Sequence, residues 1–169
     1  MKTLRLVQNA CDIAQSMVAR GMPRREILTY LITAAEKIAP TGCVASILVL
    51  DAEGLLRNGS SPSLPPDYLD AIDRLKPHPQ VGTCSAAAAT GEVVVTPDFT
   101  ADEKWSELRH LPLALGYTGA WSTPIKDPEG RVLGTFGIYC RERANPSAED
   151  RAAMSALAAA AAGAIAKAR

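Results

Sequence analysis

The sequence predicts an α+β fold: a central antiparallel sheet of roughly five or six strands, with N- and C-terminal helices on one face. Two observations predict it. Hairpin-linked β segments occupy the middle of the chain, and the segments at both ends carry the apolar spacing of amphipathic helices. Short helices and loops are expected to form a pocket on the other face. The 169 residues fit a single domain, 1–169, with a core at about 24–165.

Amphipathic helices are predicted at both ends of the chain. In residues 1–20 apolar side chains recur at alternating steps of three and four, and Gly21 ends the pattern. Pro23 suits the first turn of a second helix, which Pro40 ends. Further helices are expected at 67–75, 82–90 and 146–167.

The β segments are short and bounded by turn residues. The expected strands are residues 44–50, 55–56, 92–96, 120–126 and 132–141. Asp51–Gly54 and Asp127–Gly130 each read as a turn between two strands. The second of these has Pro at its second position and Gly at its fourth, which is a strong turn signal.

Charge and composition exclude several functions. Lys+Arg and Asp+Glu both number 18, so no net charge favours nucleic acid or an anionic membrane. The N-terminus lacks the apolar core of a signal peptide, and no apolar run is long enough to span a membrane. The cysteines are far apart, without C-x-x-C spacing: Cys11, Cys43, Cys84 and Cys140. They are therefore expected to be free thiols in a cytoplasmic protein.

Four segments carry a family resemblance. They are Leu64–Leu69, Val81–Ala87, the G-x-x-x-x-W-S-x-P-I strand Gly116–Ile125, and Gly130–Tyr139. Taken in this order they resemble a GAF domain, of the sub-type that precedes bacterial signalling outputs such as σ54 activators, histidine kinases and cyclic-di-GMP enzymes. The resemblance covers about residues 24–165 and implies a regulatory domain that binds a small molecule or a signalling partner and is not an enzyme.

The resemblance implies a pocket between the sheet and residues 81–116. Such pockets are mostly apolar with a few polar groups, and most aromatic residues of the chain lie in or near the matching segments. Ser122 is one possible polar group. The pocket candidates are Cys84, Trp105, Arg109, Tyr117, Trp121, Thr123 and Tyr139. Alternatively, Trp121 and Tyr139 only fill the core.

Cys84 supports an alternative function. It follows a glycine at the start of a predicted helix, and a helix N-terminus lowers the pKa of a thiol. Its position resembles the redox cysteine of GAF enzymes that reduce free methionine sulfoxide. Those enzymes carry further cysteines in the next loop and strand, and residues 98–126 contain none. No catalytic residue is therefore predicted. A third interpretation is an interaction module that has lost its ligand.

No cofactor or metal site is predicted. His78 and His110 are the only histidines, and neither has a second ligand at metal-binding spacing, which also disfavours haem. No cysteine precedes a histidine, as in the bilin-binding type. The Asn-Lys…Phe…Asp-Glu signature of the cyclic-nucleotide type is absent. The identity of the ligand stays open.

The end helices favour a homodimer. By the family resemblance, they pack on the sheet face away from the pocket and often continue as a dimer interface. The candidates are Leu4, Val7, Cys11, Ala14, Met154, Leu157, Ala161 and Ile165. Alternatively, these residues only cover the sheet of their own chain. No output segment is recognisable, so a signalling output is expected in trans or in a longer chain.

Overall fold

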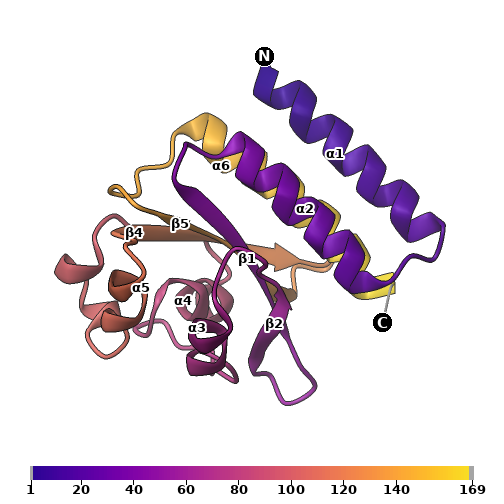
Figure 1. The fold of residues 1–169 in the computed structure, drawn as a ribbon. Coiled ribbons are helices and arrows are strands. Elements are labelled where there is room, and N and C mark those ends of the chain that lie inside the picture. Colours follow the sequence, from indigo (N-terminus) through magenta and orange to yellow (C-terminus); the bar gives the residue numbers. More distant parts are fainter. Residues whose placement is uncertain (1, 168–169) are drawn as a thin grey trace.

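A five-stranded antiparallel sheet separates two layers of helices (Figure 1). In the computed structural model, which describes residues 2–167, the strands lie in the order β2-β1-β5-β4-β3. They are β1 Cys43–Leu50, β2 Leu56–Ser60, β3 Val94–Thr96, β4 Gly119–Lys126 and β5 Val132–Cys140. All neighbouring strands are antiparallel, which confirms the predicted fold class. Residues 1 and 168–169 of the predicted domain lie outside the described range.

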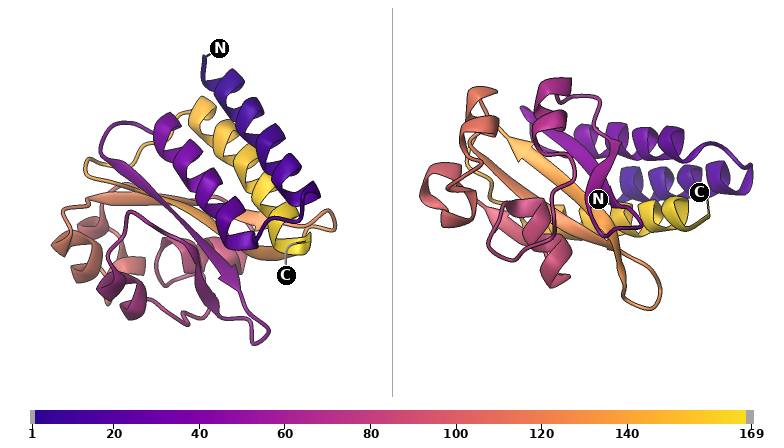
Figure 2. Two further views of the ribbon diagram at one scale, coloured as in Figure 1. Left: turned by 45° about the vertical axis from the view of Figure 1, so that its right-hand side comes forward. Right: turned by 90° about the horizontal axis from the view of Figure 1, so that it is seen from below.

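Three long helices lie on one side of the sheet. They are α1 Lys2–Ala19, α2 Arg24–Ile38 and α6 Ala148–Lys167. Helices α2 and α6 contact the strands, and α1 packs on α2 and α6 (Figures 1 and 2). Gly21 has a φ of 71° and lets the chain turn from α1 towards α2. Among residues 2–167, none of the helices combines the length and apolar character that a membrane crossing requires.

Short helices cover the opposite face of the sheet. They are α3 Pro66–Ala71, α4 Thr83–Thr90 and α5 His110–Ala114, together with two 3₁₀ turns, η1 Phe99–Ala101 and η2 Glu103–Trp105. Helix α4 contacts β4 and β5. The helix expected through residue 75 ends at Ala71, because the chain turns at Arg74 (φ 65°) so that Leu75 can bridge to Leu56.

Alternation along the strands creates two apolar cores. On the α2/α6 side, Trp121 of β4 and Phe136 and Ile138 of β5 pack with the long helices. On the α4 side, Ala120 and Tyr139 pack with the short helices. Successive strand residues point to opposite faces, so β1, β4 and β5 each contribute to both cores. The predicted pocket belongs to the α4-side core.

A disulfide joins the first residue of β1 to the last residue of β5. Cys43 and Cys140 are register partners with Cα atoms 4.2 Å apart, although 97 positions separate them in the sequence. The expectation of free thiols is therefore wrong for this pair, because strand pairing brings the two residues together. Cys11 and Cys84 are free.

Candidate functional site

The candidate site lies between α4 and the centre of the sheet. Cys84, in the first turn of α4, rests on Gly137 of β5: a Cβ atom added at position 137 would lie 3.0 Å from the Cys84 Sγ. The absence of a side chain at Gly137 thus lets the thiol reach the sheet. Ser122 of β4 is the register partner of Gly137, and Thr135 lies two residues before Gly137 on the same face.

The Cys84 thiol is buried and neutral. Burial raises the pKa of Cys84 above its ordinary value, and this outweighs the opposing effect of the Ser122 and Thr135 hydroxyls, which lie against the sulfur. The Cys84 residue is 8% exposed. The lowered pKa expected for a cysteine at a helix start is therefore not found, because desolvation penalises the thiolate more than the neutral thiol.

A chain of buried hydrogen bonds fixes the start of α4. The Trp105 Nε1 donates to the Thr83 Oγ1 at 2.7 Å, and the hydroxyls of Thr83 and Thr96 lie 2.8 Å apart. On the other side of Cys84, the Ser85 Oγ donates to the carbonyl oxygen of Lys76 at 2.8 Å. The side chains of Thr83 and Ser85, on either side of Cys84 in the sequence, therefore already have hydrogen-bond partners. The Trp105 indole N–H is likewise paired, with a residue of α4.

Buried tyrosines form the next wall of the site. The Tyr68 hydroxyl donates to the Tyr139 hydroxyl at 2.8 Å, and their rings meet edge to face. The Tyr117 ring lies 6.0 Å from that of Tyr139, with the Arg141 guanidinium 4.8 Å from the Tyr117 ring centre. Burial raises the pKa of both Tyr68 and Tyr139, so both hydroxyls are neutral at physiological pH.

Only a small cavity remains between these side chains. Its volume is about 20 Å³, enough for a single water molecule. Within the part of the chain that the structure describes, no charged side chain lines it. The lining residues are Leu48, Tyr68, Ile72, Leu75, Gly82, Thr83, Cys84, Ser85, Trp105, Leu108 and Tyr139.

The structure brings four of the predicted pocket residues into one core: Cys84, Trp105, Tyr117 and Tyr139. Trp121 and Thr123 do not join them, because strand alternation turns both side chains to the α6 side, where Trp121 packs near Met154. Their placement in the same pocket was wrong.

Arg109 is also absent from the cavity. Its guanidinium donates to the backbone carbonyls of Thr100, Asp102 and Trp105, so it braces the loop before α5. Tyr68 lines the cavity, whereas Ser122 and Thr135 are buried against Cys84 and do not line it. Thr135 and Tyr139 are four residues apart in β5 and therefore lie on the same face of the sheet. This alternation could have been used to predict that Thr135 lies near the site. Tyr68 lies in Leu64–Leu69, one of the four segments that resemble the GAF family, but it was not among the predicted pocket residues.

Most of the predicted dimer residues are buried within their own chain. They are Val7, Ala14, Met154, Leu157, Ala161 and Ile165, each at most 4% exposed. They cannot form a dimer interface in this fold, because they fill the core between the long helices and the sheet. Leu4 is 69% exposed, and Cys11 is half-buried.

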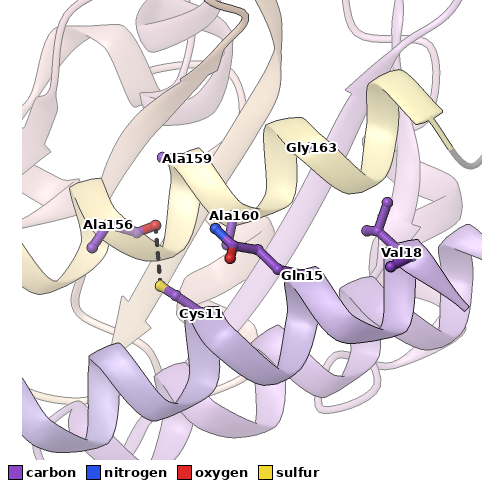
Figure 3. Close-up of a pocket in the computed structure, with 8 residues that line it drawn as sticks. Cys11, Gln15, Val18, Ala156, Ala159, Ala160 and Gly163 are labelled. Atoms are coloured by element: carbon purple, nitrogen blue, oxygen red, sulfur yellow. Dashed lines mark hydrogen bonds between the residues drawn. The ribbon is translucent and has the colours of Figure 1, made fainter.

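A groove between α1 and α6 lies beside Cys11 (Figure 3). Its volume is about 640 Å³. The Cys11 Sγ donates to the carbonyl oxygen of Ala156 at 3.5 Å at its floor. The remaining lining residues are small or apolar except for Gln15; they are Val18, Ala19, Ala159, Ala160 and Gly163.

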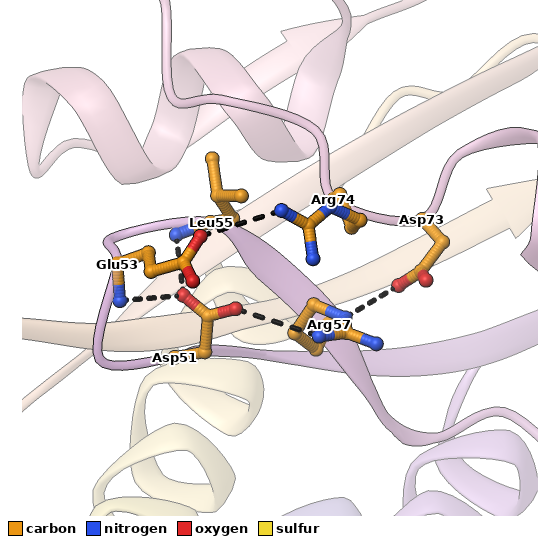
Figure 4. A network of polar contacts seen from close by, with 6 residues as sticks. All are labelled: Asp51, Glu53, Leu55, Arg57, Asp73 and Arg74. Atoms are coloured by element: carbon orange, nitrogen blue, oxygen red, sulfur yellow. Dashed lines mark hydrogen bonds and ion pairs between the residues drawn. The ribbon is translucent and has the colours of Figure 1, made fainter.

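A second groove, of about 820 Å³, lies between the β1–β2 and β4–β5 turns. Arg57 bridges Asp51 at 3.5 Å and Asp73 at 2.8 Å beside it (Figure 4). The Asp51 carboxylate also accepts hydrogen bonds from the backbone N–H of Glu53 and Leu55. Backbone hydrogen bonding, led by that from Leu55, lowers the pKa of Asp51. These charges pair with each other and hold the turn.

A pocket under short helices, on an antiparallel sheet backed by long helices, defines the GAF/PAS-like class of domains. Residues 21–166 match the family model described as GAF domain. The chain belongs to the GAF family.

A curated relative and several solved structures are similar to this chain. The methyl sulfide methyltransferase-associated sensor of Methanosarcina acetivorans is 34% identical over 134 residues, which are 79% of this chain and 13% of that protein. The chain thus spans about an eighth of this relative. A GAF domain from a phosphoenolpyruvate-protein phosphotransferase of Coxiella burnetii has a TM-score of 0.76 at 19% identity, covering 97% of this chain and 92% of that one.

The free methionine-R-sulfoxide reductase of Neisseria meningitidis, solved with its substrate, has a TM-score of 0.71 at 17% identity. The match covers 100% of this chain and 93% of that one. At these identities the two structures share the fold, which does not fix a function.

Proposed function

We propose that this GAF domain is a non-catalytic sensor that binds a small molecule beside Cys84 and passes the bound state to a signalling partner. One observation carries the proposal: the cavity beside Cys84 lies on β1 and β5, through Leu48 and Tyr139, and the opposite faces of these strands pack against α2 and α6. A ligand that moves these strands therefore acts on the helix layer. The name of the relative, a sensor, supports the same role.

A thermal-shift screen of small metabolites tests the sensing role. We expect at least one compound to raise the Tm, since a ligand at about 100 times its Kd stabilises the folded state by about 2.7 kcal/mol. In the matched variant Ile72→Phe, which places a larger side chain at the cavity wall, the same compound should give a much smaller shift. A library without any hit would count against ligand sensing.

A second copy of the chain is proposed to cover the groove between α1 and α6. The exposed large apolar side chains of the described residues are all on α1: Leu4, Leu6 and Ile13. Leu4 and the groove offer apolar surface that a dimer would bury. Light scattering at micromolar concentration measures the assembly directly. We propose that the layer of α1, α2 and α6 passes the signal on. The recipient is a separate protein or an output domain of a longer chain.

The chain is proposed to act in the cytoplasm. Cellular thiols keep most cytosolic disulfides reduced, so the Cys43–Cys140 bond would be open to reduction there.

A thiol enzyme built on Cys84 is the second candidate, favoured by the fold shared with the reductase. Its chemistry needs a second thiol. Cys43 and Cys140 are bonded to each other, and Cys11 lies on α1, beyond the sheet from Cys84. Cys84 is also neutral, whereas a thiolate is the reacting species. These observations favour the binding role.

Alkylation of Cys84 tests the enzyme alternative. In a Cys11→Ala variant, we expect iodoacetamide to modify native Cys84 at pH 7 at least about tenfold more slowly than a free thiol of ordinary pKa. Because the pKa of Cys84 is raised, the rate should increase only as the pH passes above the usual range of cysteine. Unfolded protein provides the reference rate. Rapid modification of the folded protein at pH 7 would instead support a reactive cysteine.

A further inference from the structure

Two buried hydroxyls at the site lack a hydrogen-bond partner. Among the described residues that are not exposed, the side-chain oxygens left unpaired in the interior are those of Ser122, Thr123 and Thr135. Ser122 and Thr135 are completely buried, and both point to the α4 side of the sheet. Buried hydroxyls without partners are unfavourable and are rare in folded proteins. Their presence needs a physical reason.

Both hydroxyls face the Cys84 sulfur. They lie close enough to oppose the rise in the pKa of Cys84, yet neither makes a hydrogen bond of ordinary geometry. We call these three residues the hydroxyl–thiol cluster. A thiol is a weak donor and a weak acceptor, so its contacts with the two hydroxyls are weaker than hydrogen bonds to oxygen. The cluster therefore has hydrogen-bonding capacity to spare.

Neighbouring hydroxyls on the same face are satisfied. Ser46, on the strand at the other side of Gly137, lies 2.6 Å from the Ser61 hydroxyl. Thr83, next to Cys84 in α4, pairs with Thr96 and Trp105. The shortage of partners is thus confined to the cluster.

The surroundings select an uncharged group. Among residues 2–167, no charged side chain lines the cavity beside Cys84, and Tyr68, Tyr139 and Cys84 are all neutral. A charged ligand would lose its hydration without gaining an opposite charge. A carbonyl or hydroxyl oxygen can accept hydrogen bonds from Ser122 and Thr135 at a smaller cost of desolvation.

We propose that the hydroxyl–thiol cluster anchors the single carbonyl or hydroxyl oxygen of an uncharged, otherwise apolar small ligand. This inference rests on the proposed function, since the anchored molecule is the one that is sensed. The apolar part of the ligand lies against the aromatic wall of Tyr68, Trp105 and Tyr139. Of the cluster, only Cys84 lines the cavity, which is about 20 Å³. Entry of a ligand therefore requires the segments that carry Ile72 and Leu108 to move aside, and its oxygen reaches Ser122 and Thr135 only if the Cys84 side chain also shifts.

Three ring compounds of similar size test the class of ligand. The probes are cyclopentanone, cyclopentane and cyclopentanecarboxylate, titrated into the full chain and followed by the backbone amide NMR signals of α4, β4 and β5. We expect cyclopentanone to bind about tenfold more tightly than either of the others, the ratio expected for one or two hydrogen bonds.

Paired variants test the anchor itself. The double variant Ser122→Ala, Thr135→Val should lower the affinity for cyclopentanone about tenfold and leave the affinity for cyclopentane unchanged. Thr123→Val is the matched control: it removes an equally unpaired hydroxyl from the same strand on the opposite face, and cyclopentanone binding should persist. Urea unfolding of each variant without probe establishes that it folds.

The outcomes separate the two proposals. Equal cyclopentanone binding by wild type and the double variant overturns the anchor but leaves the sensing role standing. Tighter binding of cyclopentanecarboxylate overturns the uncharged class in the same way. If no probe binds and the double variant is less stable than wild type, the cluster holds only a structural water. In that case the anchor fails, and a screen without hits would remove the sensing role separately.

Discussion

Reduction of the Cys43–Cys140 disulfide should lower the free energy of unfolding by about 2–4 kcal/mol. The bond closes a loop across a sequence separation of 97, so it removes many conformations from the unfolded chain. Its loss restores those conformations and favours unfolding. Urea denaturation with and without dithiothreitol measures the change, as does the double variant Cys43→Ala, Cys140→Ala under both conditions.

The controls distinguish the disulfide from other effects of reductant. A Cys11→Ser variant keeps the pair and should respond to dithiothreitol as wild type does. The double variant should not respond at all. Thiol counting in the unfolded, unreduced protein should give two free cysteines, Cys11 and Cys84. Four free thiols, or an unfolding midpoint indifferent to reductant, would contradict the role of this bond.

Gly134→Ala should destabilise the protein by about 3 kcal/mol. A Cβ atom at position 134 would overlap the carbonyl oxygen of Leu48 and lie 3.1 Å from the Cα of Val49, its register partner in β1. Both are backbone atoms of the neighbouring strand, so relief requires the two strands to separate. Chemical denaturation monitored by circular dichroism measures the loss.

Gly163→Ala is the matched control for this substitution. Gly163 lies in α6, and an added Cβ would meet nothing within 4 Å. Alanine is the better helix former, so this variant should gain about 0.5–1 kcal/mol. The same chemical change thus has opposite signs at two positions. Similar small effects at both would show that β1 and β5 do not pack as closely as described.

Local signals in the sequence were sufficient for the fold. Turn residues such as Pro128 and Gly130 and the two-residue period of the strands act over a few positions, and the structure confirms the order of elements. The disulfide escaped prediction because Cys43 and Cys140 meet only through strand pairing. The residues between them carry no local signal for that pairing.

The errors at the site have a common cause. Alternation showed that Trp121 and Thr123 share a face, but not that this face meets α6. Helical periodicity likewise identified the apolar side of α6, but not that Leu157 is covered by its own chain. Sequence periodicity shows which residues lie on the same face of a helix or strand. Which other element that face packs against is decided by tertiary packing. Tyr68 was missed for the same reason, since only packing brings it to Tyr139.

The position of β5 has a mechanical consequence. It lies at the centre of the sheet, carries Thr135 on one face and Phe136 on the other, and its last residue is tethered to β1 by the disulfide. Strand β5 is paired with β1 from Gly134 to Cys140 and with β4 from Val132 to Cys140, so a displacement at Thr135 is passed to both neighbouring strands as well as to α6. The disulfide adds a covalent link at the Cys140 end and keeps β1 and β5 in register there. Shear between these two strands is therefore resisted most strongly at that end of the sheet.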